Sequence, residues 1–166
     1  VCAVSTTPAR ADEGQPVAVR WWGQGFVTIE TFWNLTVAID PYSLRIGYDD
    51  PGVSADVVLI THEHGDHNNV GLVGGEPEVV RGLDEDGDVK PIWKMLDRHA
   101  NADEPTLHDR TETVFLSPNV IKIRSVDTDH DDEGGAARGH NAVFVVEVDG
   151  VKIVHCGNLG LSLIHI

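Results

Sequence analysis

Three histidines and an aspartate stand within six residues, in the segment His62-Glu63-His64-Gly65-Asp66-His67. The preceding residues 55–61 (Ala-Asp-Val-Val-Leu-Ile-Thr) predict a buried strand, because apolar and β-branched residues dominate them. Neutral imidazole and carboxylate are ligands that a borderline metal such as zinc accepts. In an extended loop these side chains are not held on one helical face, so they can surround more than one ion. The segment therefore predicts a metal-binding loop at the end of a buried strand.

Two other interpretations of the segment were weighed. A helical metalloprotease site requires a second histidine four residues after the first, and position 66 is Asp, so this interpretation fails. The interpretation without metal is a solvated polar turn that follows a strand.

The segment Thr61–His67 resembles the metal loop of the metallo-β-lactamase fold hydrolases. Residues 37–41 (Val-Ala-Ile-Asp-Pro) match the strand ending in Asp-Pro that this superfamily places before the loop. Residues 139–150 and 152–160 are similar to the branch that includes ascorbate-6-phosphate lactonases. The resemblance, over about residues 17–160, implies an α/β (α+β) fold: the N-terminal αβ half of an αββα sandwich, mostly strands with few short helices.

The resemblance also implies two adjacent metal positions. The first would take His62, His64 and a later histidine, and the second would take Asp66, His67, a bridging carboxylate and a further histidine. Zn²⁺ is the expected metal, as one or two ions, with Mn²⁺ as an alternative. A divalent ion polarises an electrophile and lowers the pKa of a coordinated water from about 16 to about 7.

His130 and His140 are the two candidates for the later histidine. His130 follows a predicted strand and precedes a Gly-rich segment, as in the superfamily, so it is the preferred ligand. His140 is expected to line the substrate cleft or to cap a turn.

Three further positions belong to the predicted site. Asn158 stands where the superfamily has the bridging Asp, and its neutral amide predicts a weakly occupied second position. Asp66 either binds the second ion and orients the nucleophile or acts as general base in a site with one metal. Asp40, directly before Pro41, is expected to steady the histidine loop through hydrogen bonds, unless it is only a turn residue.

Composition limits the classes of partner. The 166 residues carry 12 basic and 27 acidic side chains, a formal charge of −15, which disfavours nucleic-acid binding. The sequence contains no run of eighteen or more apolar residues, so it predicts no membrane-spanning helix. A small-molecule substrate is therefore expected, and the oligomeric state is left open.

The ends of the chain suggest three segments. Residues 1–11 resemble the end of an exported signal peptide with Ala9-x-Ala11 as its cleavage site, which predicts a periplasmic or secreted protein. A disordered N-terminus of a cytoplasmic protein is the alternative. Residues 12–160 form a partial metallo-β-lactamase fold domain, and residues 161–166 resemble translated sequencing adapter, so His165 is not counted as a ligand.

Segments rich in Val, Ile, Thr and aromatic residues, separated by turn formers, predict eight strands, at residues 17–22, 26–31, 35–39, 57–61, 113–116, 120–126, 142–148 and 151–155. Asp149-Gly150 predicts a two-residue hairpin between the last two. Residues 68–73 and 91–99 are candidates for short helices. The aromatic residues near the N-terminus (Trp21, Trp22, Phe26 and Trp33) are expected to pack in the core.

The functional prediction is a metal-dependent hydrolase acting on a small ester, lactone or phosphoester. The alternatives are a metal-binding domain with reduced or lost turnover, which Asn158 suggests, and an inactive fragment of such an enzyme.

Overall fold

Strand β4 (Val57–Ile60) is buried on both of its faces. The computed structural model describes residues 17–97, 106–109 and 119–160. Val57 and Leu59 point into the core between two sheets, and Val58 and Ile60 pack beneath the loops on the other side. A strand covered on both faces has no polar alternation, which explains the continuous apolar run in its sequence.

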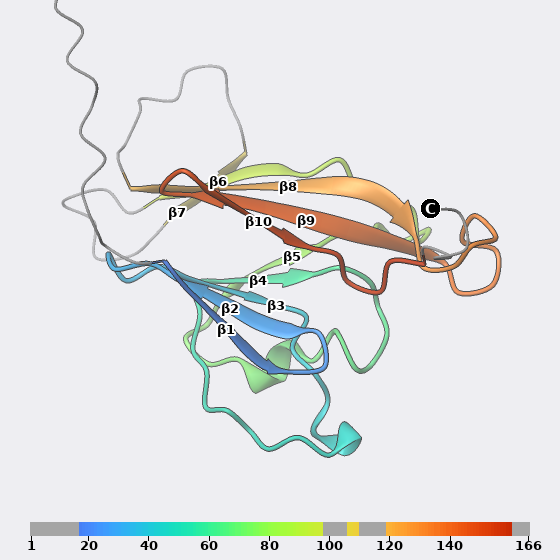
Figure 1. Ribbon diagram of the computed structural model, residues 1–166, viewed down its shortest axis with the longest axis horizontal. Helices are drawn as coiled ribbons and strands as arrows, with labels where there is room; N and C mark the ends of the chain where they lie inside the picture. Colours follow the sequence, from blue (N-terminus) through green and yellow to red (C-terminus); the bar gives the residue numbers. More distant parts are fainter. Residues whose placement is uncertain (1–16, 98–105, 110–118, 161–166) are drawn as a thin grey trace, which may run out of the picture.

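Two five-stranded sheets pack face to face in the described part of the chain (Figure 1). The first has the order β1-β2-β3-β4-β5 and the second the order β10-β9-β8-β6-β7. The strands of the first sheet besides β4 are β1 (Ala18–Gly23), β2 (Phe26–Glu30), β3 (Thr36–Ile39) and β5 (Glu78–Arg81). Those of the second are β6 (Trp93–Asp97), β7 (Thr106–Asp109), β8 (Val120–Asp129), β9 (His140–Val148) and β10 (Val151–His155).

Strand direction brings several strand ends to one edge of the sandwich. β3, β4 and β5 run parallel to one another, whereas all pairs in the second sheet are antiparallel. The carboxyl ends of parallel strands meet at one edge, so Asp40, Thr61 and Gly82 follow their strands side by side. The Ala142 amide at the start of β9 donates to the Thr61 carbonyl (3.0 Å), which joins the second sheet to this edge.

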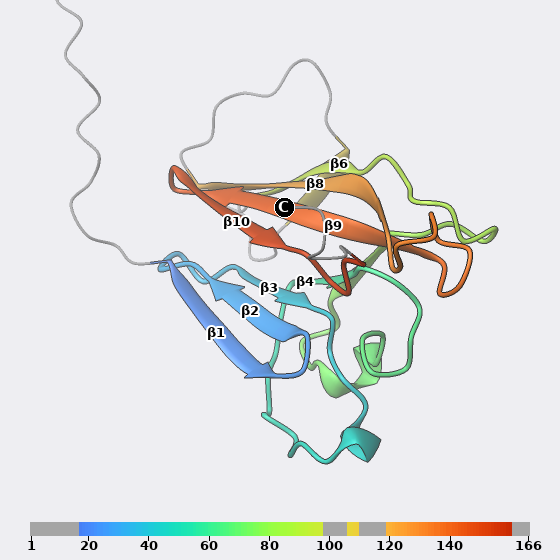
Figure 2. The same cartoon turned by 45° about the vertical axis from the view of Figure 1, so that its right-hand side comes forward.

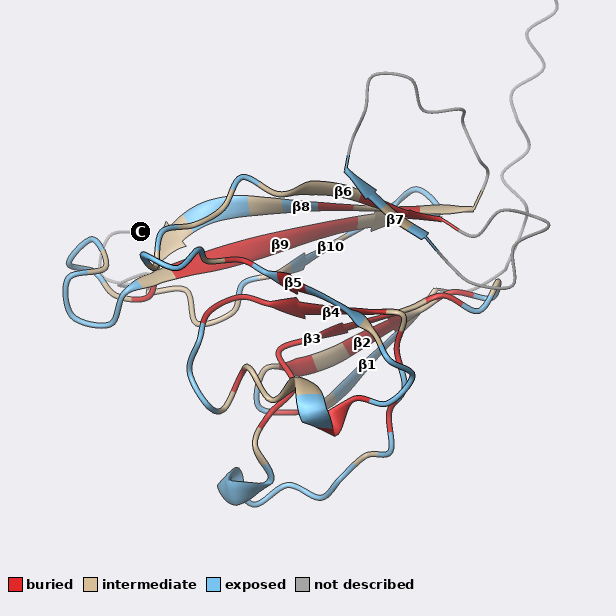
Figure 3. Cartoon of the chain, turned by 180° about the vertical axis from the view of Figure 1, so that it is seen from behind, coloured by how far each residue is buried: buried red, intermediate tan, exposed pale blue. Residues whose placement is uncertain are grey.

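The core lies between the sheets and is built from aliphatic side chains and one phenylalanine. Figure 3 shows β3, β4 and most of β9 buried. The side chains from the two sheets are Ile29, Leu35, Val37, Ile39, Val57, Leu59 and Val80 on one side, and Leu96, Ile121, Ile123, Ala142, Phe144, Val146 and Val148 on the other.

The predicted fold class is confirmed: strands dominate, and the helices in the described residues are two 3₁₀ turns, Leu44–Ile46 and Val70–Leu72. Seven predicted strands are present with ends shifted by up to three residues. The Asp149-Gly150 hairpin is confirmed, since Val148 pairs with Val151 and both turn residues have positive φ (48° and 78°). The predicted strand at residues 113–116 and the terminal segments 1–11 and 161–166 lie outside the described residues.

Two helix predictions need correction. Residues 91–99 were expected to be helical, but Trp93–Asp97 form β6, which hydrogen-bonds to β7 on one side and to β8 on the other. Sheet pairing on both sides overrides the helix propensity of Lys94, Met95 and Leu96. Residues 68–73 contain only the short 3₁₀ turn Val70–Leu72.

Strand β5 and the position of Trp21 were also missed. β5 lies at the edge of the first sheet, and its charged ends, Glu78 and Arg81, hide the strand signal of Val79 and Val80. Trp21, expected in the core, is 67% exposed. Figure 2 shows its strand β1 at the other edge of the same sheet.

Replacing Leu59 by Ala should lower the free energy of unfolding by about 2–5 kcal/mol, because the surrounding side chains cannot fully fill the cavity that the smaller side chain leaves between the sheets. Urea unfolding followed by tryptophan fluorescence measures this loss. Val154→Ala is the matched control: Val154 is 56% exposed, and the change should be within about 0.5 kcal/mol. Equal effects of the two substitutions would contradict the assignment of the core.

Candidate metal centre

A buried carboxylate organises the loop that follows β4. Asp40 is fully buried at the end of β3 and has a positive φ of 51°, a conformation that few residues other than glycine adopt. Its Oδ1 accepts the backbone N–H of Thr61 at 2.8 Å, and its Oδ2 accepts the Thr61 hydroxyl at 2.6 Å. Asp40 thereby ties the end of β3 to the residue immediately before the histidine loop.

The same carboxylate determines which ring nitrogens of two histidines are free. Because the Thr61 hydroxyl donates to Asp40, it accepts from the N–H at Nδ1 of His62, 2.8 Å away. His67 donates from Nδ1 to Oδ2 of Asp40 at 3.0 Å. In both rings Nε2 then carries the lone pair, and both Nε2 atoms are buried without a hydrogen-bond partner.

His62, His64 and His130 form a compact triangle of imidazoles. The ring centroids are 4.7 Å apart for His62 and His64, and 4.8 Å apart for each of these rings and His130. His62 and His130 are buried, whereas His64 is exposed. One nitrogen from each ring lies within 4.8 Å of the others, so the three residues could hold one cation.

Burial keeps the central ring of this group neutral. It lowers the pKa of His62 to about 4, and the neighbouring His67 ring adds to the effect. Desolvation also lowers the pKa of His64, and His130 and, more weakly, the positive charge of Arg138 act in the same direction. Neutral imidazole is the form that binds a metal.

Asp66 faces the same group from the other end of the loop. Its Oδ2 lies 3.6 Å from Nε2 of His67 and accepts a hydrogen bond from the Gln24 side chain at 2.8 Å. Its side chain is 34% exposed. Asp66 thus offers a solvent-accessible carboxylate beside the buried Nε2 of His67.

Asn158 reaches the group from the segment after β10. Its Nδ2 lies 3.2 Å from Nε2 of His130, and rotation of the amide would present the carbonyl oxygen instead. The backbone N–H of Asn158 donates to the side chain of the buried Asn141 at 3.0 Å. Asn141 also donates to Thr128 and to the carbonyl of Cys156. The position of residue 158 is therefore fixed through the backbone.

The other histidines that the structure describes take different positions relative to this group. The preferred candidate His130 lies in it, but His140 does not: its ring hydrogen-bonds to Asp129 (2.9 Å) and lies 3.8 Å from Asp88. His155 lies beside the group, 3.9 Å from Asp40, and hydrogen-bonds to the carbonyl of Gly25. His99 and His165 lie outside the described residues.

A second set of donors overlaps the first. Asp40, His62 and His67 also lie within 4.8 Å of one another. The carboxylate of Asp40 is already engaged by Thr61 and His67, so this geometry favours Asp40 as a support for the imidazoles over a direct metal ligand.

Comparison with known proteins places this geometry in a family. Residues 18–164 match the profile of the Beta-lactamase superfamily domain. The chain belongs to the beta-lactamase superfamily. The crystal structure of a "putative metal-dependent hydrolase" from Parabacteroides distasonis ATCC 8503 is similar, with a TM-score of 0.55 and 19% sequence identity, over 87% of this chain. The chain spans 61% of the length of that structure. No curated protein matches the chain.

The superfamily domain and the structural similarity agree with the metallo-β-lactamase fold predicted from the sequence. The donor set fits a divalent metal, because the pKa values of His62 and His64 are lowered and the buried Nε2 atoms of His62 and His67 have no hydrogen-bond partner among the described residues. An unpaired buried polar atom is costly unless a ligand satisfies it. The match does not extend to the lactonase branch.

An ion pair holds the loop Thr61–His67 on the side that faces strand β5. Arg81 pairs with Ile60 in the parallel register, and its Nη1 lies 2.7 Å from both oxygens of Glu63. Asn68 donates to the Glu63 carboxylate as well (3.1 Å). No local pattern indicates this contact, because Glu63 and Arg81 lie on different segments of the chain.

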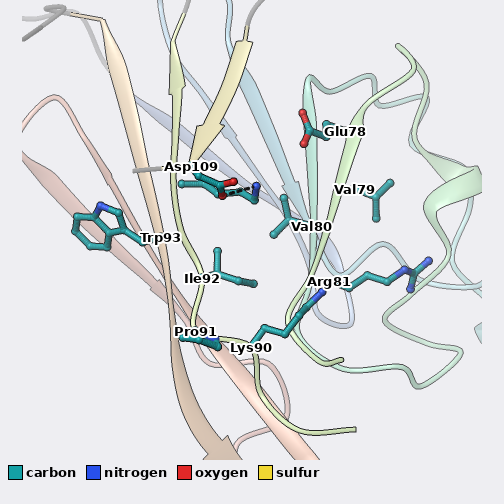
Figure 4. Close-up of a pocket in the computed structure, with 10 residues that line it drawn as sticks. Glu78, Val79, Val80, Arg81, Lys90, Pro91, Ile92, Trp93 and Asp109 are labelled. Atoms are coloured by element: carbon teal, nitrogen blue, oxygen red, sulfur yellow. Dashed lines mark hydrogen bonds and ion pairs between the residues drawn. The ribbon is translucent and has the colours of Figure 1, made fainter. Parts of the chain in front are cut away.

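A cavity of about 660 Å³ lies beyond this ion pair, between β5 and residues 90–94 (Figure 4). Its lining includes Val80, Ile92, Lys90 and the Lys94–Asp109 ion pair (3.0 Å), but none of the histidines. Figure 4 shows the side chain of Arg81 extending away from Ile92. The donor set, and not this cavity, therefore identifies the candidate centre.

Sequence reasoning missed the residues that support the ligands. Gln24 holds Asp66, and Asn141 holds residue 158. Gly25 lies against His67, since a Cβ on it would lie 2.7 Å from the ring. The Gly-x-Gly turn between two predicted strands was the available signal for Gly25, because such turns permit close approach of the backbone.

Asp40→Asn should weaken zinc binding about 10–100-fold, because an amide has one acceptor oxygen and its NH2 group cannot replace the second carboxylate oxygen that accepts from Thr61 and His67. Titration calorimetry measures the affinity, with thermal unfolding recorded in parallel to correct for loss of folded protein. Asp127→Asn removes the same charge at an exposed position on β8 and serves as the control. Unchanged zinc affinity in folded Asp40→Asn protein would rule out this role for Asp40.

Proposed function

We propose that the protein is a metal-dependent hydrolase that uses zinc to cleave a small ester, lactone or phosphoester. The observation that supports this most strongly is the pair of buried Nε2 atoms on His62 and His67 that have no hydrogen-bond partner among the described residues. Membership of the beta-lactamase superfamily and the similar solved structure point in the same direction.

The residues divide into two ligand sets in this proposal. His62, His64 and His130 would hold the first cation, and Asp66, His67 and Asn158 would contribute to a second position. Zn²⁺ fits the imidazole-rich first set best, with Mn²⁺ as the alternative. A bound divalent cation supplies Lewis acidity and a nucleophilic water at neutral pH.

The side chains of the protein supply orientation and proton transfer. Asp40 holds His62, through Thr61, and His67 in the tautomers that present Nε2. In a centre with one metal, the Asp66 carboxylate, held by Gln24, is accessible enough to accept a proton from the attacking water at Oδ2. His62 is neutral at pH 7 because its pKa is about 4, so it is available as a ligand.

The finer assignments rest on the sequence. The segments at 139–150 and 152–160 favour a substrate related to those of the lactonase branch, and the formal charge of −15 disfavours nucleic acid. No helix in the described residues is long and apolar enough to cross a membrane. A periplasmic or secreted location stays a prediction from Ala9-x-Ala11.

Asn158 favours a second candidate function, a metal-binding domain with reduced turnover. The amide group lies 3.2 Å from Nε2 of His130, in the place where the superfamily pattern has a carboxylate. A neutral amide offers less charge to balance a second divalent ion.

Asn158→Asp should raise zinc stoichiometry from about one to about two ions per chain, since a carboxylate can bridge two cations. Metal analysis of dialysed protein gives the stoichiometry, and hydrolysis of a generic phosphodiester and a lactone gives turnover before and after chelation. The backbone contact to Asn141 does not depend on the side chain at 158, so the variant should fold. Unchanged stoichiometry and turnover would show that residue 158 does not limit the second site.

A further inference from the structure

The loop that joins β8 to β9 is built around one carboxylate. Oδ1 of Asp131 accepts the backbone N–H groups of Glu133 and Gly135, both at 2.9 Å. Oδ2 accepts those of Ala137 (3.0 Å) and Arg138 (2.7 Å). Four hydrogen bonds to one side chain give residues 131–138 a single defined backbone path.

This path places Arg138 next to the imidazole group. The β8–β9 ladder ends with the pair Asp129 and His140, and one step further the N–H of His130 donates to the carbonyl of Gly139 at 3.0 Å. Arg138 directly precedes Gly139, so its backbone lies beside that of His130. The positive charge of Arg138 also contributes to lowering the pKa of His64.

The guanidinium group of Arg138 is not committed to another residue. Arg138 is exposed, and none of the ion pairs or side-chain hydrogen bonds among the described residues uses its guanidinium, although Asp132 and Glu133 lie in the same loop. By contrast, Arg20 pairs with Glu30, and Arg81 pairs with Glu63 beside the histidine loop. An unpaired cation on a fixed loop in a chain of charge −15 is available to a ligand.

We infer that Arg138 recognises an oxyanion, carboxylate or phosphate, on the substrate of the metal centre. The inference rests on the proposed function for its location and adds the class of substrate. A guanidinium group binds either oxyanion through two parallel hydrogen bonds, which fixes the orientation of the substrate as well as its charge. The Asp131 loop fixes the backbone of Arg138 before substrate arrives, which reduces the entropy lost on binding.

The test is the affinity for two probe anions, inorganic phosphate and acetate, at low ionic strength. Titration calorimetry with zinc-loaded protein and amide chemical-shift titration with zinc-free protein give the dissociation constants. Arg138→Gln should weaken binding of the recognised anion about tenfold, the effect of losing one charge-assisted bidentate contact. Arg138→Lys should recover part of the affinity, because it restores charge without the planar pair of donors. A larger loss for phosphate than for acetate identifies a phosphate group as the natural oxyanion, and the reverse identifies a carboxylate.

Two controls separate this inference from a general charge effect and from the proposed function. Arg45→Gln removes the same charge from an exposed position in the turn Leu44–Ile46 and should leave anion affinity unchanged. Zinc affinity is measured separately: protein that binds no zinc contradicts the proposed function, whatever the anion titrations show. The inference is overturned if neither anion binds, if Arg138→Gln changes neither affinity by more than about twofold, or if Arg45→Gln weakens binding equally.

Discussion

The candidate centre depends on the carboxylate of Asp40. This buried group accepts hydrogen bonds from the backbone N–H and hydroxyl of Thr61 and from the ring N–H of His67. Through Thr61 it also orients His62. A carboxylate can only accept hydrogen bonds, so each contact has a defined direction, and the directions leave Nε2 of both rings as acceptors. One charge at the end of β3 therefore leaves Nε2 as the ring nitrogen that is available to a metal ion in both His62 and His67.

The fold explains why this carboxylate can act on residues far along the chain. Parallel pairing of β3 with β4 puts Asp40 beside Thr61, and parallel pairing of β4 with β5 puts Arg81 beside the same strand end. The loop is consequently held on one side by a buried carboxylate and on the other by the Glu63–Arg81 ion pair. The second contact is exposed and weak, so the buried one dominates the geometry.

The sequence allowed the strands, the hairpin at Asp149-Gly150 and the members of the imidazole group to be predicted, because each has a local signal. Continuous apolar runs mark β4 and β9, and residue spacing marks the histidine loop. His130 was preferred over His140 because of its neighbours in the sequence, and the structure places His130, and not His140, beside His62.

The prediction of a helix at residues 91–99 was wrong because hydrogen bonding to β7 and β8 decides the conformation of β6, and the residues near β6 in the sequence do not reveal this pairing. The supports Gln24, Arg81 and Asn141 could not be predicted for the same reason, since each contacts a residue that is distant in sequence.

Residue 158 illustrates how the fold and the chemistry of the centre are separated. Its backbone is held by Asn141, and Gly157 beside it lies against the side chains of Asn141 and Thr61, where a Cβ would not fit. These contacts fix where residue 158 lies without using its side chain. The side chain can therefore change between amide and carboxylate at little cost in stability, while the charge available to metal ions changes by a full unit. In this proposal, the number of ions held depends on one side chain that the surrounding structure positions but does not constrain.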